Sequence, residues 1–405
     1  MKVRGIQPFS LLIKPAGPDC NIRCEYCFYL ETCGLYPEQT RHRMSQDTVH
    51  TLVSQYMATP QPVYAFGWQG GEPTLMGPSF FRDAFDLQRS LSPPGATISN
   101  SLQTNGTLLD EAFAQLLSKY SVLVGISLDG PAEIHDTYRR TAGGGATHHQ
   151  VIRGIELLKD AGADFNVLTL ITAANVDKPR EVYHYLKSLG IRYHQYIPCV
   201  EPLNEGLTDF SITGAQWGRF LIGIFDAWQQ EDTRTVSIRD FDSIINFLVT
   251  GRYTSCTMSG TCKQYLVVEH NGDIYPCDFY VTPEHRLGNI HTHTLEHAWR
   301  NPVMGRFGAR KARWSEACRQ CPYLALCSGD CQKMRLRGDL PSALCDGWTA
   351  FYDHALPRFR EIARRAARRH AIPFRDMTAS DIPNDAPCFC GSDRNYGNCH
   401  GGVSK

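Results

Sequence analysis

Three cysteines stand close together near the start of the chain, at Cys20, Cys24 and Cys27, in a C-x3-C-x2-C spacing. Thiolates are soft ligands that suit iron–sulfur clusters and zinc. A closed structural site uses four ligands. Three neighbouring thiolates without a fourth therefore predict a cube with one iron left open to chelate a substrate. The alternative is a zinc knuckle whose fourth ligand comes from a distant part of the chain.

Eight more cysteines lie between residues 256 and 345, in the short spacings that are typical of ligand sets. They are Cys256, Cys262, Cys277, Cys318, Cys321, Cys327, Cys331 and Cys345. Eight thiolates can hold two fully ligated cubes. Two structural zinc sites would explain the same count, but they would not explain the pairing with the three-cysteine loop.

A third group of soft ligands lies near the end of the sequence and consists of Cys388, Cys390, Cys399 and His400. So short a span of three cysteines and one histidine predicts a zinc site. The alternative is a disordered tail with free thiols. The last two of the sixteen cysteines, Cys33 and Cys199, are expected to be free thiols.

Two further motifs combine glycine with polar side chains. In Gly70-Gly71-Glu72-Pro73, the glycines let the backbone approach a ligand, and Glu72 can accept a hydrogen bond from an ammonium group. Ser127 and Arg139 flank a second turn and are placed to meet a polar ligand. The alternatives are a simple Gly-Gly-Pro turn and a surface pair between Asp129 and Arg139.

Short apolar runs alternate with amphipathic runs from Phe9 to about Gln230, which predicts repeated strand–helix units. The expected strands are Ser10–Lys14, Val63–Trp68, Thr97–Gln103, Val122–Leu128, Phe165–Ile171 and Tyr193–Ile197. The expected helices are Ser45–Tyr56, Ser79–Ser90, Asp110–Lys119, His149–Ala161, Lys178–Leu189 and Ala215–Gln229. Six such units predict a parallel sheet, closed or nearly closed, whose site lies at the C-terminal ends of the strands. A hairpin with an Asn-Gly turn is expected at Val267–Tyr275.

The composition indicates a globular protein, because 405 residues with 42% hydrophobic side chains can fill one large core and one or two small ones. Lys and Arg balance Asp and Glu at 41 each, which predicts no polyanion partner and hence no nucleic acid. Neither a bilayer-spanning run nor a signal-peptide pattern is present. Since the cysteines group as ligands, we expect a cytoplasmic protein with no membrane partner.

Together these motifs resemble the anaerobic sulfatase-maturating enzymes, radical S-adenosylmethionine enzymes with a SPASM auxiliary-cluster domain. The stretches that carry the resemblance are Leu11–Glu31, Gln69–Leu75, Asn100–Gly106, Ser127–His135, Tyr275–Tyr280 and Arg286–Ile290. It implies an α/β fold with a partial (β/α)6, TIM-like barrel at residues 1–235 and a SPASM domain at 236–350. A basic helix and linker at 351–382 and a zinc-binding tail at 383–405 would follow. That tail resembles a SEC-C type zinc knuckle.

The resemblance also implies three [4Fe-4S] clusters and S-adenosyl-L-methionine. Cys20, Cys24 and Cys27 would hold the radical cluster. Cys256, Cys262, Cys277 and Cys331 would hold the first auxiliary cluster, and Cys318, Cys321, Cys327 and Cys345 the second. The residues matched to S-adenosyl-L-methionine contacts are Tyr26, Gly71, Glu72, Ser127, Arg139 and Val200.

Asp278 matches the family's catalytic base, and its backbone is fixed beside the cluster ligand Cys277. Tyr29 and Gln69 are expected to contact substrate. The implied reaction oxidises a Cys or Ser of an unfolded sulfatase segment to Cα-formylglycine without oxygen. A 5′-deoxyadenosyl radical removes a hydrogen from Cβ, Asp278 takes the thiol or hydroxyl proton, and the auxiliary clusters accept the second electron. Besides the sulfatase, an electron donor protein and a protein partner for the zinc knuckle are expected.

Two other functions fit parts of the pattern. A SPASM peptide maturase that forms thioether or carbon–carbon crosslinks in a ribosomal peptide would share the clusters. A metal-rich adaptor would use the zinc knuckle to bind other proteins. The arginines that follow Pro357 predict a basic helix with a solvated face, with Phe359, Ile362 and Ala366 turned inward.

Overall fold

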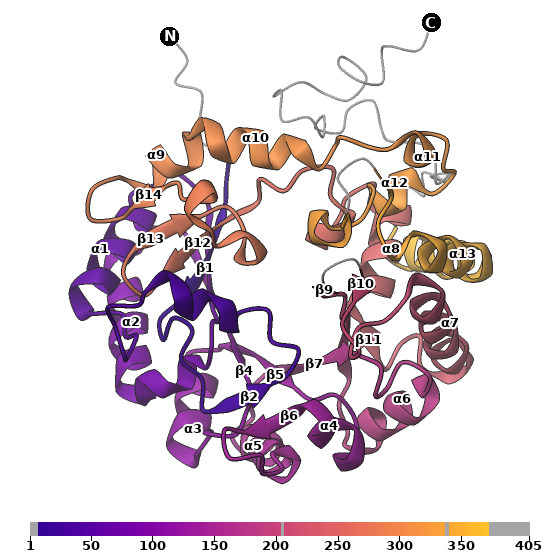
Figure 1. Ribbon diagram of the computed structural model, residues 1–405, viewed down its shortest axis with the longest axis horizontal. Coiled ribbons are helices and arrows are strands. Elements are labelled where there is room, and N and C mark those ends of the chain that lie inside the picture. Colours follow the sequence, from indigo (N-terminus) through magenta and orange to yellow (C-terminus); the bar gives the residue numbers. More distant parts are fainter. Residues whose placement is uncertain (1–6, 204–205, 337–339, 372–405) are drawn as a thin grey trace, which may run out of the picture. The chain divides into compact units, whose positions relative to one another are not determined.

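The computed structural model describes residues 7–203, 206–336 and 340–371, which form two compact units (Figure 1). The first unit contains the described residues up to Leu128, together with His135–Val167 and Gln264–Gly305. The second contains Asp129–Ile134, Leu168–Lys263 and the described residues from Arg306 onward. Each unit therefore combines stretches that are far apart in the sequence.

The core of the first unit is a sheet with the strand order β5-β4-β3-β1-β12-β13-β14. Its strands are β1 (Ser10–Lys14), β3 (Val63–Trp68), β4 (Thr97–Thr104), β5 (Leu123–Ser127), β12 (Tyr265–Glu269), β13 (Asp273–Tyr275) and β14 (Gly288–Asn289). The strands from β5 to β12 are parallel, and β13 and β14 continue the sheet in antiparallel fashion. The first four strands expected from the sequence are confirmed to within one residue at each end.

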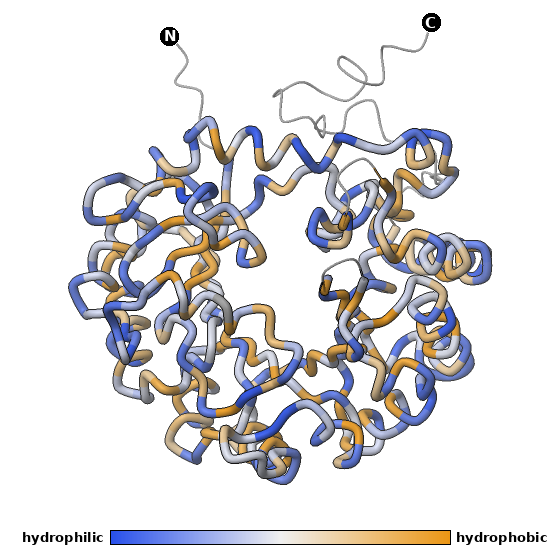
Figure 2. The backbone as a smooth tube through the Cα atoms, viewed as in Figure 1, coloured by the Kyte–Doolittle hydropathy of each residue, from blue (hydrophilic) through white to orange (hydrophobic). Residues whose placement is uncertain are grey.

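Two of the four helices listed next, α1 and α3, begin directly after capping residues, and all four begin within two residues of the expected starts. They are α1 (Gln46–Met57), α2 (Gly77–Leu91), α3 (Glu111–Lys119) and α5 (His148–Asp160). The Ser45 side chain accepts a hydrogen bond from the Thr48 N–H, and the Asp110 side chain accepts one from the Phe113 N–H. Figure 2 shows hydrophobic residues along the strands and hydrophilic residues along the outward turns of these helices.

The predicted hairpin joins the sheet of the first unit. β12 and β13 are connected through Asn271-Gly272, and Val267 lies opposite Tyr275. β12 lies directly beside β1 in parallel register, which pairs Lys14 with Glu269. This pairing brings the chain that follows β13, which was expected to form part of a later domain, within reach of side chains from β1 and β3.

The second unit contains β11, β8 and the part of β7 from Leu168 onward, in the order β11-β8-β7, and a group of packed helices. Its main elements are β7 (Phe165–Ile171), β8 (Tyr193–Pro198), β11 (Ser237–Ile238), α6 (Pro179–Ser188), α7 (Gly214–Glu231), α8 (Arg239–Thr250) and α13 (Cys345–Arg369). Aromatic rings fill the space between the helices: Phe225 of α7 contacts Phe241 of α8 and Phe359 of α13. The α7–α13 contact is close, because a Cβ on Gly347 would lie 2.0 Å from the Gly214 carbonyl oxygen.

The basic helix begins earlier than the sequence suggested. Pro357 was expected to precede the helix, but α13 starts at Cys345 and contains Pro357 within it. Phe359 is buried as predicted, and Arg364 and Arg365 are exposed. The fully buried positions of the next two turns are Ala363 and Ala367, while Ile362 and Ala366 are only half-buried. Within the described residues, no helix combines the length and the apolar character needed to cross a membrane.

Candidate active site

A short two-stranded sheet holds the three-cysteine loop. β2 (Ile22–Cys24) pairs antiparallel with β6 (Arg139–Thr141), so Cys24 lies opposite Arg139. The Cys27 N–H then donates to the Cys24 carbonyl over 3.1 Å and closes a turn. The two-residue spacing between these cysteines is thus the length of one backbone turn.

The environment of the loop fits the positively charged iron–sulfur core of a cluster. Cys24 is buried, Cys20 and Cys27 are half-buried, and none of the three forms a disulfide. Burial raises the pKa of Cys20 to about 12, and the charges of Glu72, Cys24 and Cys27 add to that effect. Thiols that disfavour each other's ionisation in a buried loop need a bound cation to become thiolates. An iron–sulfur cube meets that need.

The donor set does not fit one metal ion. Among the described residues, no three His, Cys, Asp or Glu side chains converge closely enough to hold a single ion. In a cube each thiolate binds a different iron, so its ligands stand further apart. Two side chains are placed to donate to the ligand sulfurs: Asn105 Nδ2 lies 3.6 Å from Cys20 Sγ, and Arg139 Nη1 lies 3.9 Å from Cys24 Sγ. Such donors influence the reduction potential of a cluster.

Gly71 permits close contact between the glycine motif and the cysteine loop. The Gly71 N–H donates to the Gly17 carbonyl over 2.8 Å, and the Glu72 N–H donates to the Asp19 carbonyl over 2.7 Å. A Cβ on Gly71 would lie 2.1 Å from the Asp19 carbonyl oxygen. The sequence suggested that the glycines admit a ligand. The structure shows that the missing side chain at Gly71 leaves room for the main chain of the segment that precedes Cys20.

Glu72 ties the glycine motif to the end of β4. Its carboxylate is fully buried and accepts hydrogen bonds from the Thr74 N–H and hydroxyl, the Thr104 hydroxyl and the Asn105 N–H, over 2.6–3.0 Å. Burial raises the pKa of Glu72, and these hydrogen bonds counteract the rise. The polar residues at the end of β4 thus have an internal partner in Glu72. Its predicted contact with the cofactor ammonium stays a prediction.

The remaining residues matched to cofactor contacts are buried. Tyr26 and Arg139 are buried, and the guanidinium carbon of Arg139 lies 5.4 Å from the Tyr26 ring centroid. Ser127 ends β5 and is 8% exposed, so it is nearly closed off from solvent. Val200 is buried and follows β8 in the second unit. His135 is buried, and its Nε2 lies 3.2 Å from the Thr147 hydroxyl oxygen.

Asp278 directly follows Cys277 and opens a single 3-10 turn. Its Oδ1 accepts from the Tyr265 hydroxyl at 3.1 Å and lies 3.6 Å from Cys277 Sγ. Its Oδ2 lies 3.4 Å from Gln69 Nε2 and 3.8 Å from Lys14 Nζ. The Asp278 side chain is 12% exposed and that of Lys14 only 1%. The carboxylate is therefore oriented by its neighbours on both oxygens and remains partly accessible.

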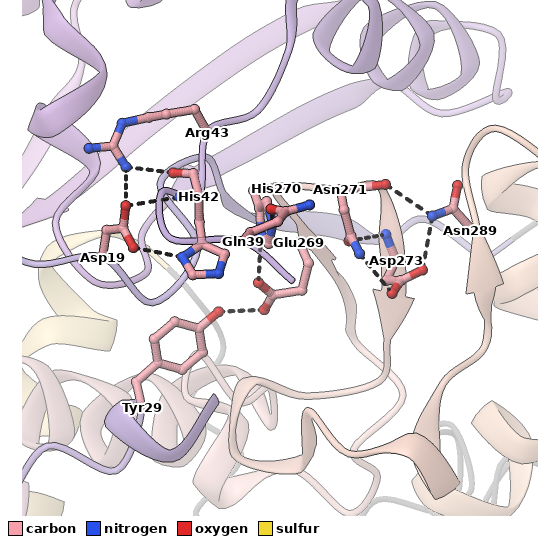
Figure 3. Close-up of polar contacts among 10 residues, drawn as sticks. All are labelled: Asp19, Tyr29, Gln39, His42, Arg43, Glu269, His270, Asn271, Asp273 and Asn289. Atoms are coloured by element: carbon pink, nitrogen blue, oxygen red, sulfur yellow. Dashed lines mark hydrogen bonds and ion pairs between the residues drawn. The ribbon is translucent and has the colours of Figure 1, made fainter. Parts of the chain in front are cut away.

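Tyr29 is a second neighbour of the Lys14 ammonium, besides Asp278. The Lys14 ammonium is 4.7 Å from the Tyr29 ring centroid, and the Tyr29 hydroxyl donates to Oε1 of the fully buried Glu269 (Figure 3). Burial, and next the Glu269 charge, raise the pKa of Tyr29 well above its usual value, so the phenol stays protonated. Because its hydroxyl is engaged, only the ring remains for the predicted substrate contact, which stays a prediction.

Sequence reasoning missed Lys14, Tyr265 and Glu269. Lys14 gave a usable signal, since a lysine that ends an apolar strand of a buried sheet requires a partner. Glu269 and Tyr265 become relevant only through the β1–β12 pairing, which no local pattern indicates. Figure 3 also shows the contact between His42 and Asp19, which helps to fix the residue before Cys20. The His42 Nδ1 atom lies 2.7 Å from Asp19 Oδ1.

The cysteines of the second unit lie on short helical turns. α11 (Glu316–Arg319) carries Cys318, α12 (Leu324–Cys327) ends with Cys327, and α13 begins with Cys345. Burial raises the pKa of Cys345, and the charges of Cys318 and Cys321 add to it. Burial also raises the pKa of Cys327, and the charges of Cys345 and Cys318 add to the rise, so the four ligands predicted for the second auxiliary cluster are neighbours.

The first auxiliary set is divided in the chain. Burial raises the pKa of Cys331 to about 12, and Cys256 contributes to the rise, so these two predicted ligands are also close. Cys262 lies in the same unit, whereas Cys277 belongs to the first unit. Cys33 is exposed and Cys199 is buried, and neither forms a disulfide. The predicted zinc ligands Cys388, Cys390, Cys399 and His400 lie outside the described residues.

Family comparisons agree with this organisation. The radical SAM superfamily matches residues 15–186, the SPASM iron–sulfur cluster-binding domain matches 250–322, and the SEC-C motif matches 386–402. A serine-type anaerobic sulfatase-maturating enzyme of Bacteroides thetaiotaomicron is 36% identical over 92% of this chain and 95% of its own length. A cysteine-type enzyme of Clostridium perfringens is 36% identical over 88% of this chain and 98% of its own length. This chain belongs to the anaerobic sulfatase-maturating enzymes.

A solved structure of such an enzyme supports the fold of this maturase. Native anSMEcpe with bound AdoMet and Cp18Cys peptide superposes with a TM-score of 0.83 at 35% identity, over 89% of this chain and all of the other. The predicted α/β fold with radical SAM and SPASM domains is confirmed. The same domains imply [4Fe-4S] clusters with S-adenosyl-L-methionine. The individual ligand assignments, the four-part domain division, the zinc ion and the cytoplasmic location stay predictions.

Proposed function

We propose that this maturase oxidises a Cys or Ser of an unfolded sulfatase segment to Cα-formylglycine without oxygen, with Asp278 as the base. Homologous enzymes perform this conversion by radical SAM chemistry. The observation that carries the proposal for Asp278 is its partly accessible carboxylate, oriented by Tyr265, Gln69 and Lys14 directly beside Cys277. A general base must be oriented and reachable by the proton that it removes.

The residues of this chain divide the work by position. When bound, the radical cluster and S-adenosyl-L-methionine supply a 5′-deoxyadenosyl radical that removes hydrogen from Cβ, and the auxiliary clusters supply an acceptor for the second electron. Asp278 takes the thiol or hydroxyl proton. The Tyr265 hydroxyl donates to Oδ1 and the Gln69 amide to Oδ2, and each carboxylate oxygen keeps a lone pair that can accept this proton. Gln69 fixes the direction of Oδ2, and Lys14 provides the compensating positive charge.

The substrate and other partners follow from this chemistry. The Cβ atom of the target residue must come close to the radical-cluster loop, which is largely buried. The target segment is therefore extended and unfolded when it binds. An electron donor protein reduces the radical cluster. The SEC-C tail binds a separate protein partner. The equal identity to a serine-type and a cysteine-type relative leaves both target residues open.

The first experiment uses the full-length protein with reconstituted clusters under anaerobic, reducing conditions. S-Adenosyl-L-methionine is added with peptides that carry the sulfatase Cys-x-Pro-x-Arg or Ser-x-Pro-x-Arg motif, and products are identified by mass spectrometry. We expect formylglycine from at least one peptide. Formation of 5′-deoxyadenosine with no altered peptide would retain the radical chemistry and exclude this substrate.

The base is tested with Asp278→Asn. The amide keeps the shape of the side chain but cannot accept the proton, so formylglycine should fall about 10²-fold or more while 5′-deoxyadenosine still forms. Glu284→Gln, an exposed substitution in the same segment, is the matched control and should retain full yield. Normal formylglycine yield from Asp278→Asn would remove the base assignment.

A further inference from the structure

Three consecutive residues in the second unit adopt left-handed backbone conformations. Ser328, Gly329 and Asp330 have φ angles of +48°, +72° and +60°, and they connect Cys327 to Cys331. Residues other than glycine lose about 1–2 kcal/mol each in this conformation, and they normally adopt it singly. Because the two cysteines are assigned to different auxiliary clusters, this left-handed turn links the two cluster sites.

Two cations hold the left-handed turn through its carbonyl groups. The Lys311 ammonium donates to the Asp330 carbonyl over 2.8 Å and to the Thr257 carbonyl over 2.7 Å. The Arg335 guanidinium donates to the Gly329 carbonyl over 2.7 Å and to the Ser328 carbonyl over 3.1 Å. Hydrogen bonds from charged donors are roughly twice as strong as neutral ones, so they offset the backbone strain. Thr257 directly follows Cys256, and the ammonium thus also supports a second segment that carries a predicted ligand.

The burial of Lys311 calls for a nearby anion. Its side chain has no exposed surface, and no carboxylate in the described part of the chain lies within ion-pair distance of it. A buried ammonium with only two carbonyl partners is costly unless negative charge lies close by. Asp330 directly precedes Cys331 and Thr257 directly follows Cys256, so the Lys311 ammonium lies beside the main chain of two predicted cluster ligands. Thiolates at these two positions would supply the missing anion.

Asp330 is the opposing charge in this region. Its carboxylate accepts hydrogen bonds from the Cys331 N–H, the Ser342 hydroxyl and the Trp348 indole. Those three donors engage the Asp330 carboxylate, while Lys311 binds the Asp330 main chain. Within the described residues, Lys311 therefore contacts Asp330 through the main chain and forms no ion pair with its carboxylate.

We propose that Lys311 is a positioning residue that fixes the turn between the auxiliary clusters and raises their reduction potentials. Thiolate-ligated cubes are net negative and become more negative on reduction, so a fixed buried cation favours the reduced form. Higher potentials make the auxiliary clusters better acceptors for the second electron of the reaction. The biological reason for a raised potential rests on the proposed function. The raised potential itself can be measured without it.

The experiment isolates the auxiliary clusters. Cys20→Ala/Cys24→Ala/Cys27→Ala removes the radical cluster, so electron paramagnetic resonance of the reconstituted full-length chain reports only the remaining cubes. In this background Lys311→Gln should lower the midpoint potential of at least one auxiliary cluster, at unchanged iron and sulfide content. Lys311→Arg keeps the charge and should restore the potential. Arg313→Gln, an exposed cation on the same segment, should cause no shift.

Unchanged midpoint potentials in fully loaded Lys311→Gln protein would overturn the proposal. If that variant fails to take up iron, Arg335→Gln decides, because its guanidinium holds the same turn and should produce a smaller shift in the same direction. No shift in Arg335→Gln, together with failed loading of Lys311→Arg, would show that side-chain shape and not charge is needed. None of these measurements uses a peptide substrate, so their outcome is independent of whether formylglycine is the product.

In the background that retains the radical cluster, Lys311→Gln should change the coupling of the reaction. The ratio of 5′-deoxyadenosine to formylglycine should rise, because the second electron leaves the substrate less readily. If the midpoint potential falls and the product ratio stays the same, Lys311 sets the potential but does not influence formylglycine formation.

Discussion

The charge beside the cysteine ligands differs between the two units. In the first unit Glu72 adds to the burial that raises the pKa of Cys20, although Arg139 provides a cation beside Cys24. In the second unit Lys311 lowers the pKa of both Cys327 and Cys331. Negative charge disfavours the reduction of a cluster and positive charge favours it. The contrast suits a radical cluster that must give up an electron and auxiliary clusters that must accept one.

The units also differ in how they hold their cysteines. The radical loop is held by main-chain contacts with the glycine motif, which require the absence of a side chain at Gly71. The turn between Cys327 and Cys331 is held by two long cationic side chains, Lys311 and Arg335. The first arrangement should therefore be sensitive to added volume, and the second to lost charge.

The largest expected effect comes from added volume at the radical loop. Gly71→Ala places a methyl group 2.1 Å from the Asp19 carbonyl oxygen, so the loop must move. We expect iron at the radical site and cleavage of S-adenosyl-L-methionine to be lost, while the auxiliary clusters still load. Gly34→Ala, where the new methyl group meets no atom within 4 Å, should behave as the parent. Normal cofactor cleavage by Gly71→Ala would show that the loop is not fixed in this way.

An intermediate effect is expected from acid on the second unit. Burial lowers the pKa of His194 from 6.5 to about 4, against a smaller opposing effect of the Ile191 carbonyl and Asp232. Its Nε2 lies 3.1 Å from the Ile191 carbonyl oxygen and its Nδ1 3.0 Å from the Tyr196 hydroxyl, which suits a neutral ring. Because the folded pKa is below the unfolded value, this stability is full above pH 6.5 and is lost as the pH falls toward 4.

His194→Gln separates this histidine from acid effects on the clusters. Glutamine can keep both hydrogen bonds and does not titrate. Between pH 7 and pH 5 the parent should lose about 2 kcal/mol more unfolding free energy than the variant, as measured by urea denaturation. The exposed His50→Gln should follow the parent. Identical pH dependence in the parent and His194→Gln would refute the assignment.

The smallest expected effect is the most direct test of the charge contrast. Glu72→Gln removes the carboxylate charge near Cys20 and leaves one donor of the Thr74 or Thr104 group poorly matched, at a cost of about 1–3 kcal/mol in stability. The radical cluster should become easier to reduce, opposite in sign to the change that Lys311→Gln produces at the auxiliary clusters. Redox titration of the loaded protein measures both. A downward shift in Glu72→Gln would break the contrast.

The strands of the sheet could be predicted because their patterns are local. Val63–Trp68 and Phe165–Ile171 are confirmed to the residue, since runs of β-branched and aromatic side chains bounded by turns favour buried strands. β2 and β6 were missed because each has only three residues and because the two strands that pair are more than a hundred positions apart in the sequence. α8 was also missed, although Phe241, Ile244, Phe247 and Leu248 show helical spacing in the sequence.

The site was predictable where chemistry requires a residue type, and not where packing decides. The cysteine spacings predict cluster ligands because few side chains bind iron, and the family resemblance assigns the base to Asp278; both assignments stay predictions. The buried partners Lys14 and Glu269 depend on the register between β1 and β12, which joins residues some 250 positions apart. α13 runs through Pro357 because Phe351 and Phe359 pack on other helices, and this tertiary contact overrides the local signal for a break.

Two main-chain hydrogen bonds, between Gly71 and Gly17 and between Glu72 and Asp19, join two segments that are distant in the sequence into one structural unit. Since main chain binds main chain, the side chains of Pro18 and Asp19 are not what joins the two segments. A designer who moves the three-cysteine loop into another scaffold must therefore move the Gly70–Glu72 turn with it. Transferring residues 17–27 alone would carry over the ligands without the surface on which they are arranged.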